Sequence, residues 1–174
     1  MAHCCLKKVD AMRTIRSVTI PSGTDLITLY REKVAGYPKF FKMDTLCKLG
    51  FLATELLLQD DCDRFIPRED RAVIAFSRHG CECNDRHYID TLADYPSPAL
   101  FVYTLPNIVS GEIAIRNHYE GETSSFILDR YDSEIINSVL ENVFLDDITS
   151  SAIVAWIDCI SDSEWTCQVS LIEK

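Results

Sequence analysis

The sequence predicts an α/β fold in which a mixed, mainly parallel sheet is flanked by helices. Residues 71–77, RAVIAFS, and 151–160, SAIVAWIDCI, are short and almost continuously apolar. Such runs are typical of strands that helices cover on both faces. Between these strands, apolar residues recur at helical spacing, so strands and helices alternate along the chain. This alternation favours a layered α/β domain with right-handed crossovers.

Length and composition indicate one folded domain over residues 1–174, because the chain is long enough for one core and short for two. The apolar content of 47% provides that core. A net charge of -10 with no basic run argues against a nucleic-acid partner. No apolar stretch approaches the roughly 20 residues that span a bilayer, and the first 17 residues lack the apolar core of a secretory signal. We therefore expect no membrane span and a cytoplasmic location.

The first elements follow from local signals. Residues 14–20 alternate apolar with polar and end at PSG, which predicts a strand and a turn. A short helix is expected over 24–34, with Thr24 or Asp25 as its N-cap. Asp44 is the expected cap of a longer helix, because apolar residues then recur at helical spacing: Leu46, Leu49, Leu52, Ala53, Leu56 and Leu57.

The segment after the 71–77 strand is less regular. Residues 85–95 predict a helical turn, and residues 99–104 are rich in strand-forming side chains. A helix is expected to start near Pro106 and to be followed by a turn at Gly121.

The last third of the chain alternates strand and helix signals. Residues 123–128 predict a strand and residues 133–144 a helix, ahead of the buried strand at 151–160. Because residues 165–174 alternate apolar with polar, we expect an edge strand that pairs antiparallel.

The densest set of potential metal ligands is HGCECNDRH, which holds His79, Cys81, Cys83 and His87. Thiolate and imidazole ligands suit tetrahedral zinc. Paired zinc ligands usually stand two or more residues apart, however, and Cys81 and Cys83 would point to opposite sides of an extended segment. We interpret the segment as a polar loop with two incidental thiols and predict neither a metal nor another cofactor.

Other reactive side chains are expected to be structural. Cys47 and Cys159 lie in apolar periodic segments, which predicts buried free thiols and no structural disulfide. His3, Cys4 and Cys5 indicate a frayed terminus rather than a redox site. Four acidic residues at predicted helix ends or loops are expected to be solvated caps, namely Asp60, Asp61, Asp63 and Asp146.

Three segments, YPKFFKMDTLCKLGFLATELLL, RAVIAFS and SPALFVYTLPNIVSGEIAIRNHYEGETSSFIL, resemble the N-terminal half of β-ketoacyl-acyl-carrier-protein synthases. The resemblance covers residues 37–160, and its most specific part is Pro106 to Arg116. It implies a single thiolase-like half-domain. The family's two catalytic histidines belong to the C-terminal half, and His79, His87 and His118 match no catalytic motif. We interpret these three as surface histidines.

In that family, a cysteine in the turn between a strand and a buried helix takes the acyl chain, and the helix dipole favours its thiolate. Aligned without gaps, this turn falls on Asp129, Arg130, Tyr131 and Asp132, with Tyr131 nearest the nucleophile's place. None is a thiol, and a tyrosine hydroxyl with its ordinary pKa of about 10 is a poor substitute. The resemblance therefore implies a turn that has lost its nucleophile and holds no catalytic residue.

The resemblance implies a non-catalytic accessory or scaffold protein in carrier-protein-dependent fatty-acid or polyketide synthesis, such as aryl-polyene synthesis. Its partners would be a ketosynthase subunit, an acyl carrier protein or both. Chain length factors provide the precedent, because they pair with a ketosynthase through the strand before this turn, here 123–128. A homodimer through the same strand is equally compatible with an unpaired edge.

Two other hypotheses stay open. One is an enzyme with rebuilt acyl-transfer or metal-dependent chemistry at the Asp129–Asp132 turn or in the His79–His87 loop. The other is a stand-alone α/β protein that shares only descent with the family. In each case the sheet face that the family's second half covers must be covered differently, and we expect an exposed apolar patch to mark that place.

Overall fold

The computed structural model describes residues 11–174 and is built on a five-stranded sheet of order β1-β5-β4-β2-β3. β2 pairs in parallel with β3 and β4, whereas β5 pairs antiparallel with β1 and β4. β5 is thus the strand of this sheet that runs against the other four, which confirms the mixed, mainly parallel sheet. The strands are β1 (Arg13–Thr19), β2 (Arg71–Ser77), β3 (Thr123–Ile127), β4 (Ser151–Ser161) and β5 (Glu164–Glu173).

The prediction that residues 165–174 form an edge strand is wrong, because β5 lies between β1 and β4. Its buried side chains face the helices of one layer, namely Trp165, Cys167, Val169 and Leu171. The residues between them face the opposite, less covered side. Alternating apolar and polar residues indicate that one face of the strand is covered and the other is open to solvent. An interior antiparallel strand can show this pattern as well as an edge strand.

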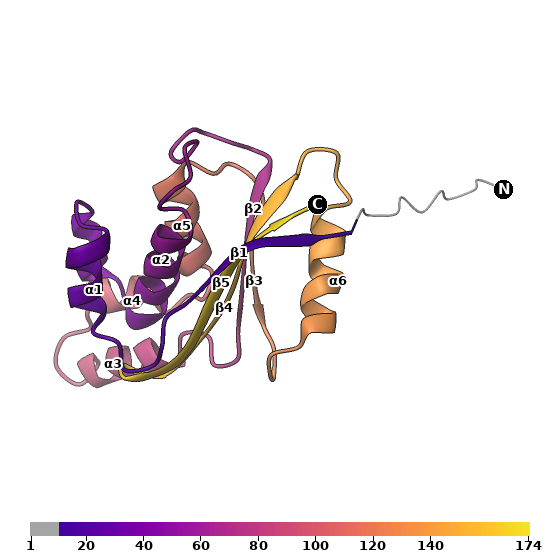
Figure 1. The fold of residues 1–174 in the computed structure, drawn as a ribbon. Coiled ribbons are helices and arrows are strands. Elements are labelled where there is room, and N and C mark those ends of the chain that lie inside the picture. The colour runs from indigo at the N-terminus through magenta and orange to yellow at the C-terminus, as the bar shows by residue number, and fades with distance from the viewer. Residues whose placement is uncertain (1–10) are drawn as a thin grey trace.

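Helices lie on both faces of the sheet, in unequal number (Figure 1). One face carries α1 (Leu26–Lys33), the 3-10 helix η1 (Pro38–Lys42), α2 (Thr45–Leu57) and α5 (Ile108–Asn117). Within residues 11–174, α6 (Ser133–Val143) stands alone on the other face. β2 is buried along its whole length, as predicted, and separates the two apolar clusters that these layers form.

The predicted helix caps are present. Asp25, rather than Thr24, caps α1 by accepting the Ile27 N–H at 3.0 Å. Asp44 caps α2 by accepting the Cys47 N–H at 3.0 Å. Both helices therefore begin where a short acidic side chain can satisfy a free backbone donor.

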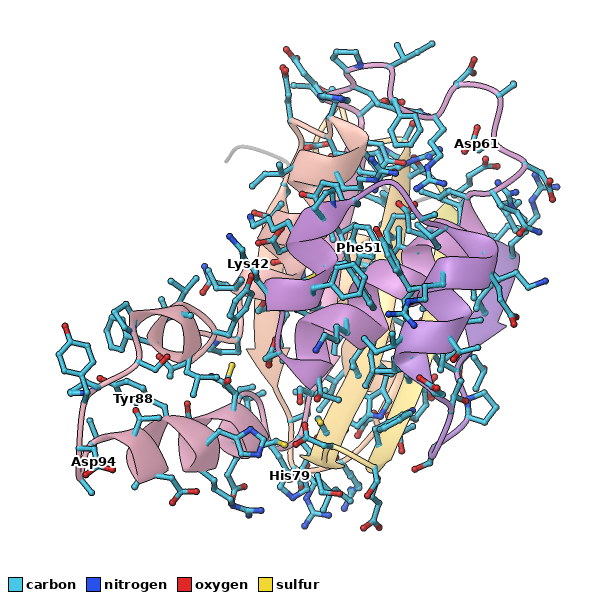
Figure 2. The ribbon with its side chains drawn as sticks, turned by 90° about the vertical axis from the view of Figure 1, so that its left-hand side faces the viewer. Lys42, Phe51, Asp61, His79, Tyr88 and Asp94 are labelled. Atoms are coloured by element: carbon cyan, nitrogen blue, oxygen red, sulfur yellow. The ribbon has the colours of Figure 1, made fainter. Side chains whose placement is uncertain are left out.

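Helices α3 (Glu82–Thr91) and α4 (Pro98–Val102) form an arm that projects from the body of the molecule (Figure 2). The strand-forming character of residues 99–104 is overridden, because Ser97 caps α4 and the Phe101 ring packs at 5.5 Å on that of Tyr88. The helix cap and the tertiary ring contact therefore outweigh the local strand propensity of this segment.

The described cysteines are all free, and Cys47 and Cys159 are buried, as predicted. The predictions for His3, Cys4 and Cys5 lie outside the described residues. None of the helices within residues 11–174 is long and apolar enough to cross a bilayer.

Candidate functional site

The segment that aligns with the family's nucleophile turn lies at the carboxyl end of the parallel strands. β3 ends at Ile127 and α6 starts at Ser133, so the predicted strand, turn and helix are confirmed. This edge of an α/β sheet is where ligands and reactive groups usually lie. The turn is therefore the first candidate site.

Asp132 caps the helix that follows the turn. Its Oδ1 accepts the N–H groups of Glu134 at 3.0 Å and Ile135 at 3.2 Å, which makes it the N-cap of α6. A capping carboxylate satisfies the donors that would otherwise attract an anion at the helix start. The sequence carried this signal, since an aspartate directly precedes the helical run.

Tyr131, which the resemblance places nearest the family's nucleophile, lies against another ring. It packs edge to face on Trp156 of β4, with 5.4 Å between ring centroids, and is 54% exposed. Asp129 and Arg130 point into solvent and form a pair at 4.0 Å, an exposed contact that contributes little. Such a wet turn lacks the low-dielectric surroundings that activate a nucleophile.

A cavity of about 240 Å³ lies beside Tyr131 and is lined by residues of α6 and of strands β1, β4 and β5. Its walls combine hydroxyl and amide groups with apolar side chains, and the Ser17 and Ser170 hydroxyls hydrogen bond at 2.7 Å. Other polar lining residues are Thr14, Ser133, Asn137 and Gln168. This face is consequently suited to water and polar contacts.

The expectation of an apolar patch where the family's second half would lie stays a prediction. Several exposed apolar side chains gather in the arm and its exit, at Ile89, Leu92, Tyr95, Phe101, Val102 and Leu105. Since polar groups already line the open face, hydration can replace a covering layer there. The arm is the surface that favours a protein contact.

The four residues considered as metal ligands, all in the segment after β2, contact different partners. His79 is bound to Asp158 of β4, with 2.9 Å between Nδ1 and Oδ2. Asp158 also accepts the backbone N–H groups of His79 at 2.8 Å and Arg78 at 3.1 Å. Burial alone would raise the pKa of Asp158, but these hydrogen bonds outweigh burial and lower it.

Cys81 stands at the start of α3 and is buried, with its pKa raised to about 12 by burial and by the Asp44 carboxylate. Cys83 and His87 lie one turn apart on α3, beside Asp162 of the turn between β4 and β5. The extended geometry assumed for Cys81 and Cys83 is wrong, because the chain is helical from Glu82. Sequence spacing offered no signal for Asp162, since it lies far along the chain.

The remaining predicted residues are mostly at the surface. His118 is exposed and ends α5 with a left-handed backbone, φ 57°. Asp146 accepts the Thr149 N–H at 2.6 Å, as a cap does. Asp61 is an exception: it pairs with Arg71 at 3.3 Å and is not a solvated cap.

Replacing Asp158 by asparagine is expected to cost about 1.5–3 kcal/mol at neutral pH, because hydrogen bonds to a charged acceptor are lost. Since the pKa of Asp158 is lowered in the native state, its contribution is present above the unfolded value of about 3.9 and is lost as pH falls below it. Urea unfolding of both proteins at neutral and acidic pH measures this. Asp129→Asn is the exposed control, and a difference that persists at about pH 2 would contradict the assignment.

The strand order and the strand–turn–helix at the sheet's carboxyl edge agree with the half-domain that the resemblance implies. The solved structure of the ishigamide ketosynthase/chain length factor matches 87% of this chain with a TM-score of 0.69 and 18% identity. The ketosynthase ApeO in complex with its chain length factor ApeC from Xenorhabdus doucetiae matches 94%, with a TM-score of 0.67 and 14% identity. The chain thus has the fold of these proteins.

The matched length differs between the two structures. This chain spans 48% of the ishigamide protein chain, or about half its length, and 79% of the second. No protein-family model matches the sequence, and no curated protein matches it either. The similarity is therefore one of fold.

Proposed function

We propose that this chain, as a single domain over residues 1–174, is a non-catalytic accessory or scaffold subunit of a cytoplasmic, carrier-protein-dependent fatty-acid or polyketide pathway, with aryl-polyene synthesis as one such pathway. Its partner in this proposal is a ketosynthase subunit, and an acyl carrier protein is a second. The observation that carries it is a ketosynthase-like fold in which the turn aligned with the family's nucleophile holds a helix cap, Asp132, and a ring packed edge to face on Trp156, Tyr131.

The geometry of the β3 edge supports a protein partner. Two backbone hydrogen bonds flank β3 and join it to β2. The Val73 N–H donates to the Glu122 carbonyl at 2.8 Å, and the Leu128 N–H donates to the Ser77 carbonyl at 2.9 Å. Because alternate residues of a strand turn their backbone groups to opposite edges, Thr123, Ser125 and Ile127 direct theirs away from β2. β3 ends the sheet, so these groups are available to a strand of another chain.

Two further features are consistent with a subunit interface. The exposed apolar side chains of the arm provide a hydrophobic surface for a partner. A solved structure with the same fold is a complex between a ketosynthase and its chain length factor. We infer pairing through residues 123–128 with a ketosynthase, and pairing with a second copy of this chain is the competing assembly.

The test is complex formation with a ketosynthase and with an acyl carrier protein, measured by mass photometry and pull-down. Ser125→Pro removes an outward N–H while leaving the bonds to β2 in place, since proline is tolerated on edge strands. We expect it to weaken the complex at least about tenfold, through one lost hydrogen bond and a steric block.

Ser125→Ala is the matched control, because it loses the same hydroxyl but keeps the N–H. A strict monomer that binds neither protein would overturn the proposal, as would equal binding by Ser125→Pro. A homodimer that Ser125→Pro dissociates would assign the edge to self-pairing. A covalent mass shift with acyl-carrier-protein or acyl-coenzyme-A substrates would favour the enzyme hypothesis.

A further inference from the structure

We propose that Cys83, His87 and Asp162 form a zinc site that fastens the α3–α4 arm to the hairpin between β4 and β5. This inference does not depend on the accessory function. The thiol, imidazole and carboxylate ligand atoms lie within 4.8 Å of one another. A thiolate, an imidazole and a carboxylate together form a ligand set that suits zinc, with water in the fourth position.

The spacing on α3 explains two of the ligands. Cys83 and His87 are four residues apart on a continuous helix, so both side chains lie on the same face. That face is turned toward the β4–β5 turn, where Asp162 lies. Small metal sites are commonly assembled from two ligands one turn apart on a helix and a third ligand from a distant segment.

The distances are already close to those of coordination. His87 Nε2 lies 3.2 Å from Asp162 Oδ2, and Cys83 Sγ lies 3.9 Å from Asp162 Oδ1. Tetrahedral zinc with ordinary bond lengths places nitrogen and oxygen ligands about 3.4 Å apart and sulfur and oxygen about 3.6 Å apart. The two contacts use different oxygens of Asp162, and all ligand atoms lie within 4.8 Å of one another. Side-chain rotations that bring the three ligands closer by up to about 1 Å would therefore complete the three-ligand geometry.

A supporting residue holds the carboxylate in place. The Thr45 hydroxyl, at the start of α2, donates to Asp162 Oδ1 at 2.5 Å. Side chains that orient metal ligands in this way usually affect affinity strongly. The site thus joins three elements that are distant in sequence: α2, α3 and the β4–β5 turn.

The adjoining cavity contains an independent sign of a missing ligand. It measures about 160 Å³ and is lined by Cys83, His87, Asp162 and Asn84 among others. Asn84 is 3% exposed, and its Oδ1 has no hydrogen-bond partner within residues 11–174. A buried unpaired carbonyl is costly, and a zinc-bound water in this cavity would satisfy it.

The charges in the cavity also allow a dication. Asp44 and Asp162 contribute carboxylates, and Lys48 is the cationic lysine among the lining residues. With Cys83 as a thiolate, two Asp carboxylates, one Lys and Zn²⁺ sum to zero. A bound dication would therefore leave little uncompensated charge in this partly buried space.

Zinc titration of tag-free protein under a non-thiol reductant tests the site. We expect one zinc per chain by elemental analysis and, with cobalt as a probe, the absorption of tetrahedral thiolate coordination. Cys83→Ser, His87→Gln and Asp162→Asn should each weaken binding by more than about tenfold. Thr45→Val should weaken it by about 10- to 100-fold and keep the one-to-one stoichiometry.

The controls use the same residue types outside the site, Cys62→Ser and His118→Gln, both at exposed positions. His87 is about half exposed, so His87→Gln should keep the fold, as circular dichroism can verify. Failure of the native chain to bind zinc would overturn the site, and so would equal binding by His87→Gln. Zinc-dependent protection of 82–105 from hydrogen exchange is the expected sign that the metal fastens the arm.

Discussion

Glu55→Ala is expected to lower the free energy of unfolding by about 3–5 kcal/mol, because it leaves two partly buried guanidinium groups without their counter-ion. Glu55 is 4% exposed and binds Arg64 and, at 3.1 and 3.3 Å, Arg116. Burial lowers the pKa of Arg64, while Glu55 acts in the opposite direction. Removing the carboxylate keeps the desolvation cost and abolishes the attraction that offsets it.

Urea unfolding followed by circular dichroism measures this change. Arg86→Ala is the matched control, because it breaks an exposed ion pair on α3. In this pair the Arg86 guanidinium lies 2.5 Å from Glu82 Oε1. Exposed pairs of this spacing contribute about 0.3–0.5 kcal/mol. If Glu55→Ala cost no more than Arg86→Ala, the buried network would not stabilise the fold.

Gly121→Ala is expected to destabilise the chain by about 3 kcal/mol, at the upper end for overpacking. A Cβ at this position would lie 2.6 Å from the carbonyl oxygens of both Glu69 and Arg71. These are backbone atoms at the start of β2, so neither can move aside as a flexible side chain could. The predicted turn at Gly121 is confirmed, and the reason for glycine is this close approach of two chain segments.

Gly111→Ala is expected to have the opposite effect on stability from Gly121→Ala. Gly111 lies inside α5, and a Cβ there meets nothing within 4 Å. Alanine should therefore stabilise the protein by about 0.5–1 kcal/mol through helix propensity. Thermal and urea unfolding of the two variants should shift in opposite directions, and shifts of the same sign would contradict this account of Gly121.

Elements whose signals are local were predictable. Asp44 followed by apolar residues at helical spacing predicted α2 and its cap, and the apolar run 71–77 predicted β2. These signals depend on backbone donors and side-chain periodicity within a few residues, and the tertiary structure preserves them. The turn at 129–132 was located in the same way, through its place between a strand and a helix.

Features that depend on distant neighbours were not predictable from spacing. Alternation in 165–174 could not say whether one strand or two would pair with β5, since β1 closes the second edge from the other end of the chain. Residues 99–104 favoured a strand until the Ser97 cap and the Tyr88 ring held them as α4.

The candidate sites also have features that the sequence alone determines and features that depend on distant neighbours. The sequence by itself determined that the turn at Asp129–Asp132 has no thiol, because residue identity needs no fold. Only the tertiary structure decided that Tyr131 packs edge to face on Trp156 and that Asp162 lies beside Cys83 and His87. Side chains from remote segments converge only when strands and helices pack into layers, and one sequence has no local pattern that records that convergence.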